Sequence, residues 1–489
     1  MPQSCDATPA IEESSSHEAA NSPLFVDLDG TLIRTDLLQE AVLCLAKKSF
    51  SRALRIPLWL LKGRAYMKRR LANEACPNIG LVPANTEFVN FLVDEKRRGR
   101  QIFLATASDE IFANKIADRF GLFEGVIASD GTTNMKGAEK ARRCQELSAT
   151  FSYAGNDRAD FEIFAHAQQR FLVSPTRTAL SMSKKVPVTR VWTQKQDRLR
   201  LWARALRVHQ WAKNLLLFVP LLAAHLYGDP RHVIAVAVGF VAFGLLASAT
   251  YIVNDLFDLE SDRRHPTKKA RPFAAGDLPI AQGIFAAAVL GALSVTISLL
   301  LPFGFAMILL AYLVSTLLYS IILKQYVVID VIALAGLYTL RIVAGTMLLG
   351  VELSFWLLAF SMFTFFGLAL VKRCAELRML TKSEEHYAQG REYTVDDYQL
   401  MQTFGVSAAF LSVLVMAFFI EDSLTSNVYA RPVLLWFVLP AYGYWFCRMW
   451  LKTSRMEMHD DPIVFSVSDR GSLITIGFIC LVVLAARFL

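Results

Sequence analysis

The second half of the chain contains one long apolar stretch after another. Several of these stretches are near 20 residues, which is enough for a helix to cross a hydrocarbon core of about 30 Å. Others are shorter and need tilt or polar flanks to do so. The pattern predicts an all-α polytopic domain of nine transmembrane helices. The predicted spans are residues 214–228, 232–253, 280–300, 303–322, 327–349, 353–371, 404–420, 432–450 and 471–488.

The average composition hides two unlike halves. Of the 489 residues, 54% are hydrophobic and 19% are charged, whereas a soluble globular protein carries about 25% charged residues. The mean hydropathy is +0.37. These values exclude a disordered, collagen-like or small disulfide-rich chain. Because the apolar runs begin only near residue 214, the part before them is predicted to be a separate soluble domain.

The basic residues are distributed unevenly among the predicted loops. A net charge of +8 and a pI near 9.1 are compatible with nucleic acid, an anionic membrane surface or anionic substrates as partners. The loops after spans two, four, six and eight carry most Lys and Arg, and the opposite loops carry almost none. The positive-inside rule then predicts a multi-pass membrane protein with the N-terminal domain and these loops in the cytoplasm. This distribution favours membrane and anionic substrates and predicts no nucleic-acid partner.

The cysteines and the N-terminus point to a cytoplasm-facing protein. Seven cysteines are scattered along the chain without a CxxC pair or a zinc-site spacing, which indicates reduced thiols. Residues 1–22 are polar and have neither a basic nor an apolar signal-peptide region. We expect this stretch to be a disordered tail.

A short apolar strand from Leu24 ends in two aspartates. Asp27 and Asp29 are two residues apart, so on a strand they point to one face. At a strand end they can share one cation, and one of them can act as a nucleophile. The alternative for the Asp29-Gly30 pair is an ordinary turn between strands.

Three further segments follow this strand in order. Residues 102–110 form an apolar strand that contains Thr106, and residues 134–143 begin a basic helix that carries Lys140. Residues 151–164 read as a strand and a glycine turn, followed by Asn156, Asp157 and Asp160. Together the four segments resemble the haloacid-dehalogenase-like phosphatases over residues 23–180.

That resemblance implies an α/β Rossmann-like domain with a helical cap at about residues 35–95. It implies that Asp27 is the phosphoryl-accepting nucleophile and Asp29 the general acid/base, and that Thr106 and Lys140 hold the phosphoryl oxygens. Magnesium would be bound by Asp27 and Asp29 with Asp157 or Asp160. The family often has Gly-Asp where this chain has Gly155-Asn156, so a weakened or inactive phosphatase remains an alternative.

The predicted cap contains an unusual stretch at residues 51–70. It mixes Leu, Ile and Trp with many Arg and Lys. One interpretation is a cap helix with a solvated basic face. The other is an interfacial helix that touches anionic lipid or a lipid-linked substrate.

After a basic connector at residues 181–213, span two ends in a cluster of acids. Asp255, Asp258 and Asp262 are spaced i, i+3 and i+7, which places them on one helix face. A charge at bilayer depth costs at least about 2.5–3.5 kcal/mol, and a divalent cation removes that penalty and the mutual repulsion. The alternative is a solvated acidic and basic loop. The basic residues that follow offer donors for a diphosphate: Arg263, Arg264, Lys268, Lys269 and Arg271.

This pattern resembles the UbiA-type intramembrane prenyltransferase superfamily over residues 200–489. The resemblance implies that Asn254, Asp255, Asp258 and Asp262 form the first site for a Mg²⁺-bound diphosphate. Many members have a second pair of aspartates where this chain has only Asp330, which we include as a further metal ligand. Arg341 and Tyr338 return to nearly the same helix face as Asp330. Asp330 and Arg341 either pair with each other or hold a phosphorylated substrate.

Residues 206–214, 368–380 and 461–470 strengthen the resemblance to one branch, the decaprenyl-phosphate phosphoribosyltransferases. That branch transfers 5-phosphoribose from phosphoribosyl diphosphate to a polyprenyl phosphate. It implies phosphate-binding roles for a set of cations, each of which could instead be a snorkelling interface residue. The set is Lys213, Lys324, Arg341, Lys372 and Arg373.

These features together predict a bifunctional membrane enzyme. The membrane domain would make a phosphoribosylated polyprenyl phosphate, and the soluble domain would remove its 5-phosphate to give polyprenyl-phosphoryl ribose, a precursor of arabinose donors. Both domains would use Mg²⁺, and a homo-oligomer is left open. One alternative is an aromatic prenyltransferase that uses a prenyl diphosphate. The other is a non-enzymatic transporter or receptor with a degenerate phosphatase-like domain.

Overall fold

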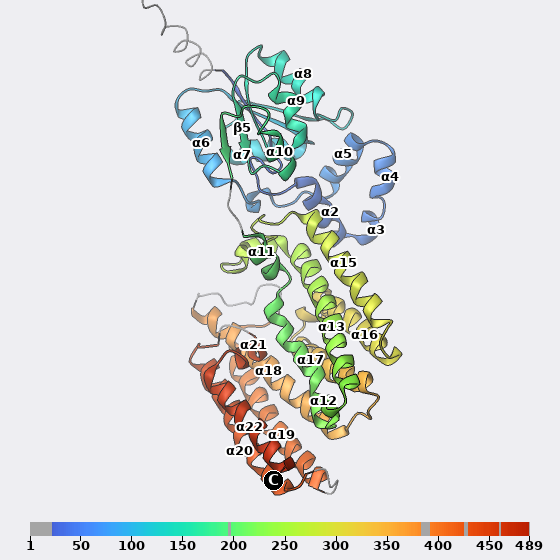
Figure 1. The fold of residues 1–489 in the computed structure, drawn as a ribbon. Helices are drawn as coiled ribbons and strands as arrows, with labels where there is room; N and C mark the ends of the chain where they lie inside the picture. Colours follow the sequence, from blue (N-terminus) through green and yellow to red (C-terminus); the bar gives the residue numbers. More distant parts are fainter. Residues whose placement is uncertain (1–21, 194–196, 383–391, 425–428, 459–460, 489) are drawn as a thin grey trace, which may run out of the picture. The chain divides into compact units, whose positions relative to one another are not determined.

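The computed structural model describes residues 22–193, 197–382, 392–424, 429–458 and 461–488. The predicted tail at residues 1–22 therefore lies almost wholly outside the described residues. The chain divides into two compact units, and each is described separately (Figure 1). The first comprises Met1–Ala205 with Ile252–Ala286, and the second comprises Leu206–Tyr251 with Ala287–Leu489.

The first unit is built on a parallel sheet of six strands in the order β3-β2-β1-β4-β5-β6. Alternate residues of the central strand face opposite hydrophobic clusters, since Leu24 and Val26 pack in one and Phe25 in the other. The predicted α/β fold is confirmed. The strands are β1 (Leu24–Val26), β2 (Ile102–Asp109), β3 (Gly125–Ser129), β4 (Ser152–Gly155), β5 (Arg170–Val173) and β6 (Arg190–Trp192).

The sheet continues past the boundary predicted at residue 180. Strand β6 comes from the segment that we expected to be a connector, and it pairs with β5. The reason is the side chain of Trp192, which is 8% exposed and packs against the rings of Phe88, Phe91 and Phe171. The aromatic contacts make this short strand part of the core.

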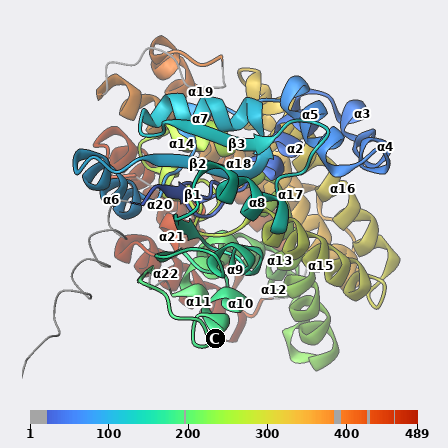
Figure 2. The ribbon, with the colours of Figure 1, turned by 90° about the horizontal axis from the view of Figure 1, so that it is seen from above.

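The cap between β1 and β2 is smaller than predicted. Its helices are α2 (Leu37–Lys48), α3 (Phe50–Ala53), α4 (Ile56–Leu61) and α5 (Arg64–Glu74). Helix α6 (Thr86–Arg97) lay partly inside the predicted cap at residues 35–95, but its Phe88 and Phe91 pack against the sheet residues Phe171 and Trp192. The remaining helices of this part are α7 (Glu110–Phe120), α8 (Ala138–Leu147), α9 (Phe161–Phe164), α10 (Arg177–Met182) and α11 (Arg198–Ala205). In Figure 2 the strands lie between α7 and the pair α9 and α10.

The first unit also contains the segment with the predicted diphosphate motif. This segment includes the end of α13 (Pro230–Phe257), then α14 (Leu259–Arg264), η5 (Lys268–Ala270) and the start of α15 (Ile280–Ser298). Two ion pairs join it to the cap and its flanks. Arg34 pairs with Asp277 at 2.6 Å, and Glu40 pairs with Arg263 at 2.6 Å.

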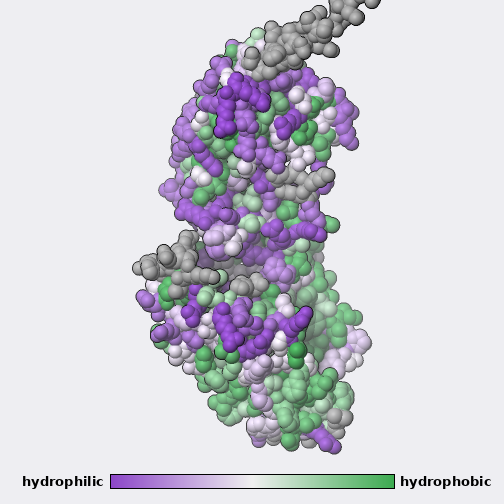
Figure 3. Space-filling view, turned by 90° about the vertical axis from the view of Figure 1, so that its left-hand side faces the viewer, coloured by the Kyte–Doolittle hydropathy of each residue, from purple (hydrophilic) through white to green (hydrophobic). Residues whose placement is uncertain are grey.

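The second unit is helical, and its surface is largely apolar on the face drawn in Figure 3. Among the described residues of the chain, seven helices are long and apolar enough to cross a membrane. This agrees with an integral membrane protein. The seven are α13, α15, α16 (Phe303–Ile321), α17 (Ile329–Leu349), α18 (Phe355–Lys382), the helical stretch around α19 (Tyr398–Leu424) and α22 (Arg470–Phe488).

The other two predicted spans are interrupted, so the count of nine stays a prediction. Residues 214–228 form the end of η3 (Val208–Phe218), then α12 (Val219–Ala223) and η4 (Leu226–Gly228). Pro220, which lacks a backbone N–H, stands at the first turn of α12. Residues 432–450 begin with the 3₁₀ helix η8 (Pro432–Phe437) and continue as α20 (Val438–Ser454), which has 17 residues.

Candidate functional sites

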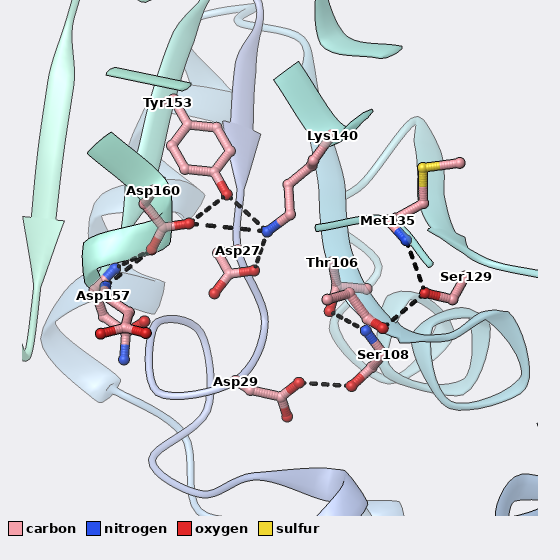
Figure 4. Close-up of polar contacts among 12 residues, drawn as sticks. Asp27, Asp29, Thr106, Ser108, Ser129, Met135, Lys140, Tyr153, Asp157 and Asp160 are labelled. Carbon is pink, nitrogen blue, oxygen red and sulfur yellow. Dashed lines mark hydrogen bonds and ion pairs between the residues drawn. The ribbon is translucent and has the colours of Figure 1, made fainter. Parts of the chain in front are cut away.

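A buried polar cluster lies where β1 and β4 end (Figure 4). The Nζ atom of Lys140 lies 2.7 Å from the Oδ1 atom of Asp27 and also donates a hydrogen bond of 2.9 Å to the hydroxyl of Tyr153. Tyr153 in turn donates to Asp160 at 3.0 Å. All four side chains are buried. The structure thus brings Asp27, Lys140 and Asp160 together, as predicted, and adds Tyr153, which sequence reasoning missed.

The second aspartate of the strand end has different partners. The hydroxyl of Ser108 donates to Asp29 Oδ2 at 2.6 Å, and the backbone N–H of Leu37 donates to Asp29 Oδ1 at 2.9 Å. Thr106 is completely buried in β2, and its Oγ1 accepts from the backbone N–H of Ser108. Both residues lie in the part of β2 where its register with β3 shifts, and the hydroxyl of Ser108 contacts the acidic side chain of Asp29.

Burial raises the pKa of both aspartates above the usual value of a carboxylic acid. It raises the pKa of Asp27 to about 6, and the charge of Lys140 limits that rise. It raises the pKa of Asp29 to about 7, and the neighbouring charge of Asp36 adds to the rise. What distinguishes the two carboxyl groups is their partners, since Asp27 is held by Lys140 and Asp29 by Ser108 and the backbone of Leu37.

The acidic loop after β4 is organised around Asp160. Its Oδ2 atom accepts hydrogen bonds of 2.9 Å from the backbone N–H groups of Asn156 and Asp157. The side chain of Asp157 is exposed and accepts a bond from Thr176. Gly30 has a φ of +78°, and a Cβ atom there would overlap the amide of Asn156. Asn156 is thus the loop side chain that packs on the Asp29-Gly30 turn, and Asp157 points elsewhere.

The cap contributes one cation that the sequence did not single out. Lys68 of α5 donates to the backbone carbonyl of Ala107 at 2.5 Å and to Asn134 at 2.7 Å. Burial lowers its pKa, and the charge of Asp29 opposes that effect. The ammonium group therefore lies beside the end of β2, next to Ser108 in the chain.

The acids at the end of α13 surround one arginine. The Nη1 atom of Arg271 lies 3.1 Å from Asp255 and 2.7 Å from Asp262, and both carboxylates are nearly buried. Asp258 interrupts the helix as the N-cap of α14 and accepts a bond from Asn254. Because Asp255 and Asp262 converge on one cationic group, the donor set fits a divalent cation in the same place. Within the described part of the chain, no three acidic, His or Cys side chains are already grouped closely enough to hold a metal.

The basic residues after this motif are not equivalent. Arg263 donates to Glu40 through two nitrogens, at 2.9 and 2.6 Å. This predicted phosphate ligand therefore forms a buried ion pair with Glu40. Lys268 and Lys269 are exposed on η5. Among the predicted diphosphate donors, Arg271 forms ion pairs with both Asp255 and Asp262.

In the second unit, three predicted residues surround an acid that the sequence did not identify. Asp461 is 7% exposed, and its carboxylate lies 2.7 Å from Lys213 Nζ and 3.4 Å from Lys372 Nζ. It also accepts from the hydroxyl of Tyr338 at 2.8 Å. Two ammonium groups that share one carboxylate leave a net positive charge in this cluster. An anion with more than one charge can use that surplus.

Asp330 and Arg341 do not pair with each other. Arg341 donates to Asn214 at 3.0 Å and to the hydroxyl of Tyr312 at 3.1 Å. Asp330 is fully buried and bonds to Arg373 at 2.6 Å and to the hydroxyl of Tyr393.

Asp330 and Arg373 are thus each other's partners in this structure; the metal-ligand role of Asp330 and the phosphate-binding role of Arg373 stay predictions. Arg373 is fully committed, because it also bonds to Glu376 and Tyr319. Lys324 is half-buried on η6 (Leu323–Gln325), and its predicted phosphate-binding role stays a prediction.

Comparison with known proteins identifies the family of the helical part. Residues 215–468 match the model of the UbiA prenyltransferase family. A protein of Sinorhizobium fredii called "Uncharacterized protein y4nM" is 36% identical over 94% of this chain and 90% of its own length. The decaprenyl-phosphate phosphoribosyltransferase of Mycobacterium tuberculosis is 34% identical over 44% of this chain and 73% of its own length.

Two solved structures are similar at low identity. A UbiA homolog from Archaeoglobus fulgidus bound to GPP and Mg²⁺ has 16% identity and a TM-score of 0.45, and the match covers 58% of this chain and 99% of that chain. A haloacid-dehalogenase family hydrolase from Salmonella enterica has 13% identity and a TM-score of 0.28, with 41% and 82% covered. The family match spans more than half of the sequence, and the chain therefore belongs to the UbiA prenyltransferase family.

Proposed function

We propose that the protein is a bifunctional enzyme of the bacterial cytoplasmic membrane, with its sheet domain on the cytoplasmic side. Its helical part transfers 5-phosphoribose from phosphoribosyl diphosphate to a polyprenyl phosphate. Its sheet domain then removes the 5-phosphate and leaves polyprenyl-phosphoryl ribose. The observation that carries the first activity is the pair of lysines, Lys213 and Lys372, around Asp461. The similarity to decaprenyl-phosphate phosphoribosyltransferases supports it.

The transferase proposal is supported by the excess of cations in the helical unit. A prenyl diphosphate and a neutral aromatic acceptor bring phosphate from one substrate only. Phosphoribosyl diphosphate and a polyprenyl phosphate both carry phosphates, and Lys213, Lys372 and Arg341 supply positive charge for more than one of them. The acceptor is already an anion, so the transfer needs no protein nucleophile.

The bond changes in the transferase balance without a further reactant. An oxygen of the polyprenyl phosphate bonds to the anomeric carbon of ribose while the bond from that carbon to the diphosphate breaks. Inorganic diphosphate leaves with the negative charge. Arg271 pairs with Asp255 and Asp262, and when a divalent cation takes its place on these carboxylates the guanidinium would be available to bind diphosphate oxygens.

The phosphatase proposal rests on the different surroundings of the two aspartates. Asp27, held by Lys140, is positioned to attack phosphorus and form an aspartyl phosphate as the ribose 5-oxygen leaves. Asp29, held by Ser108, is positioned to protonate that oxygen and then to take a proton from the attacking water. Lys140 balances the charge on the transferred group.

Both sites have ligands for Mg²⁺. Asp255, Asp258 and Asp262 would hold it in the helical part, and Asp27, Asp29 and Asn156 would hold it in the sheet domain. We give Asn156 preference over Asp157 because its side chain packs on the Asp29-Gly30 turn. When bound, the ion would supply charge neutralisation for phosphate oxygens.

Incubation of the purified full-length protein with labelled phosphoribosyl diphosphate and polyprenyl phosphate tests the transferase. We expect a labelled lipid from the wild-type protein and from a Glu260→Gln control, whose side chain is exposed in the same segment. Asp255→Asn should abolish the product. If wild-type protein labels no lipid but consumes a prenyl diphosphate with an aromatic acid, the proposal is wrong.

Mass spectrometry of the same lipid products tests the phosphatase. Asp27→Asn should cause the lipid that still carries the 5-phosphate to accumulate, whereas the exposed control Asp94→Asn should behave as wild type. Unchanged removal of the phosphate by Asp27→Asn would show that Asp27 is not the nucleophile.

A further inference from the structure

The cap has an apolar surface that is exposed among the residues that the structure describes. We call residues 50–62, which comprise α3, α4 and the residues around them, the cap hairpin. Four of its apolar side chains are strongly exposed: Phe50 at 69%, Leu54 at 65%, Leu58 at 60% and Leu61 at 84%. In both ribbon views the hairpin lies at the edge of its unit, away from the sheet (Figures 1 and 2). A soluble domain rarely exposes so many large apolar residues in so short a segment.

The exposure is one-sided. Ala53, Ile56 and Trp59 of the same hairpin are partly buried and pack against the core cluster of the domain. The hairpin is therefore anchored on one side by these three residues while the leucines point outward. This arrangement is that of an amphipathic element with a fixed orientation, because the anchored side chains prevent the leucines from turning inward.

The charge around the exposed leucines has a single sign. Residues 41–73 contain nine Lys or Arg and no Asp or Glu. Of these cations, Arg52 and Arg55 are exposed within the hairpin itself and Lys62 ends it. An apolar face bordered by cations is complementary to a surface with an apolar interior and an anionic rim, which is the chemistry of an anionic phospholipid bilayer.

The hairpin also begins close to the end of a spanning helix. The Nζ atom of Lys47 donates a hydrogen bond of 3.1 Å to the backbone carbonyl of Phe257, the last residue of α13. Helix α13 is one of the seven that can cross a membrane. Phe50 follows Lys47 by three residues, so the start of the hairpin is held near the point where α13 ends. Both segments belong to the same compact unit.

We propose that the cap hairpin docks onto the anionic lipid surface of the membrane that the chain spans. The leucines enter the boundary between headgroups and acyl chains, and the arginines bind lipid phosphates. The docking is independent of either proposed reaction. It ties the cap to the membrane, the phase in which a polyprenyl-linked product would reside.

Hydrogen–deuterium exchange of the full-length protein tests this docking. The protein is compared in detergent, in zwitterionic nanodiscs and in nanodiscs that contain anionic phospholipid. We expect amides of residues 50–62 to exchange several-fold more slowly in the anionic nanodiscs than in the other two. Peptides around Leu147, an exposed leucine at the end of α8, should exchange equally in all three.

Two variants make the test specific. Leu54→Gln with Leu58→Gln should remove the protection in anionic nanodiscs, and Arg52→Gln with Arg55→Gln should remove its dependence on anionic lipid. Leu147→Gln should leave the protection as in the wild type. Equal exchange of residues 50–62 in all three preparations would overturn the proposal. Protection of residues 50–62 in detergent that is as strong as in the anionic nanodiscs would also overturn it, because it would indicate that a second copy of the chain covers the hairpin.

Discussion

The guanidinium of Arg263 donates two hydrogen bonds to the carboxylate of Glu40, although the residues are 223 positions apart. Both side chains are nearly buried, at 7% and 4%. The pair joins cap helix α2 to helix α14 of the acidic motif. The sheet domain and the acidic motif at the end of α13 belong to one compact unit.

Loss of Glu40 is expected to destabilise this unit. Breaking a buried pair by removing one partner leaves an uncompensated charge, which costs about 3–5 kcal/mol. Glu40→Gln should therefore lower the unfolding temperature by several degrees in a thermal scan of the purified protein. The matched control is Glu260→Gln, because its partner Arg264 is exposed on the same helix and such pairs contribute about 0–1 kcal/mol. Equal effects of the two substitutions would contradict this prediction.

Removal of the Ser108 hydroxyl should slow the phosphatase step. The hydroxyl donates to Asp29 at 2.6 Å, and a hydrogen bond to a charged group contributes about 1.5–3 kcal/mol. Ser108→Ala should reduce kcat at least about tenfold, since about 1.4 kcal/mol corresponds to a factor of ten. Release of phosphate from the phosphorylated lipid measures the effect. Ser148→Ala, which removes an exposed hydroxyl, is the control and should retain wild-type kcat.

The cap lysine is expected to act on substrate binding. Lys68 reaches from α5 to the carbonyl of Ala107 and to Asn134 beside the site. Lys68→Met should raise KM for the phosphorylated substrate by about tenfold and change kcat less, because uniform binding is lost. The control is Lys96→Met, because the side chain of Lys96 is exposed on α6. A fall in kcat with unchanged KM would instead assign Lys68 to the chemical step.

Site candidates that follow local patterns could be singled out from the sequence, and the structure brings Asp27 and Lys140 into contact. Asp27 and Lys140 stand at a strand end and at a helix start, and such signals are contained within a few neighbouring residues. Asp461 could not be found in this way, because its partners Lys213 and Tyr338 are 248 and 123 positions distant. A helical period predicts which face a residue occupies but not what packs against that face.

The same limit explains why the alternative of an Asp330–Arg341 pair was wrong. Periodicity placed both residues on one face of α17, but α18 supplies Arg373 as the partner of Asp330. Hydropathy alone also did not reveal the 3₁₀ geometry of residues 208–218. Residues 214–218 of that segment begin the span predicted at 214–228, which continues as α12 and η4 and is therefore not one continuous α-helix.

The substitution Asp330→Asn tests whether Asp330 stabilises the fold by pairing with Arg373 or acts as a ligand of Mg²⁺. If Asp330 neutralises Arg373, the substitution should lower the unfolding temperature, and the protein that remains folded should keep the wild-type dependence of transferase activity on Mg²⁺ concentration. Asp255→Asn should show the opposite pattern, with little change in unfolding temperature and loss of Mg²⁺-dependent activity. A changed Mg²⁺ half-saturation in Asp330→Asn would return this residue to the set of metal ligands.

Arg271 lies where Asp255 and Asp262 converge, so it competes with a divalent cation for the same carboxylates. Arg271→Gln should make the motif more negative and lower the half-saturating Mg²⁺ concentration by about tenfold, which corresponds to about 1.4 kcal/mol. The same substitution removes a donor to the diphosphate and should raise KM for phosphoribosyl diphosphate. Titration of Mg²⁺ and of the donor in the labelled-lipid assay measures both effects. Arg264→Gln, whose side chain pairs with Glu260 in solvent, should change neither. A higher Mg²⁺ requirement in Arg271→Gln would mean that the arginine supports the metal site instead of competing for it.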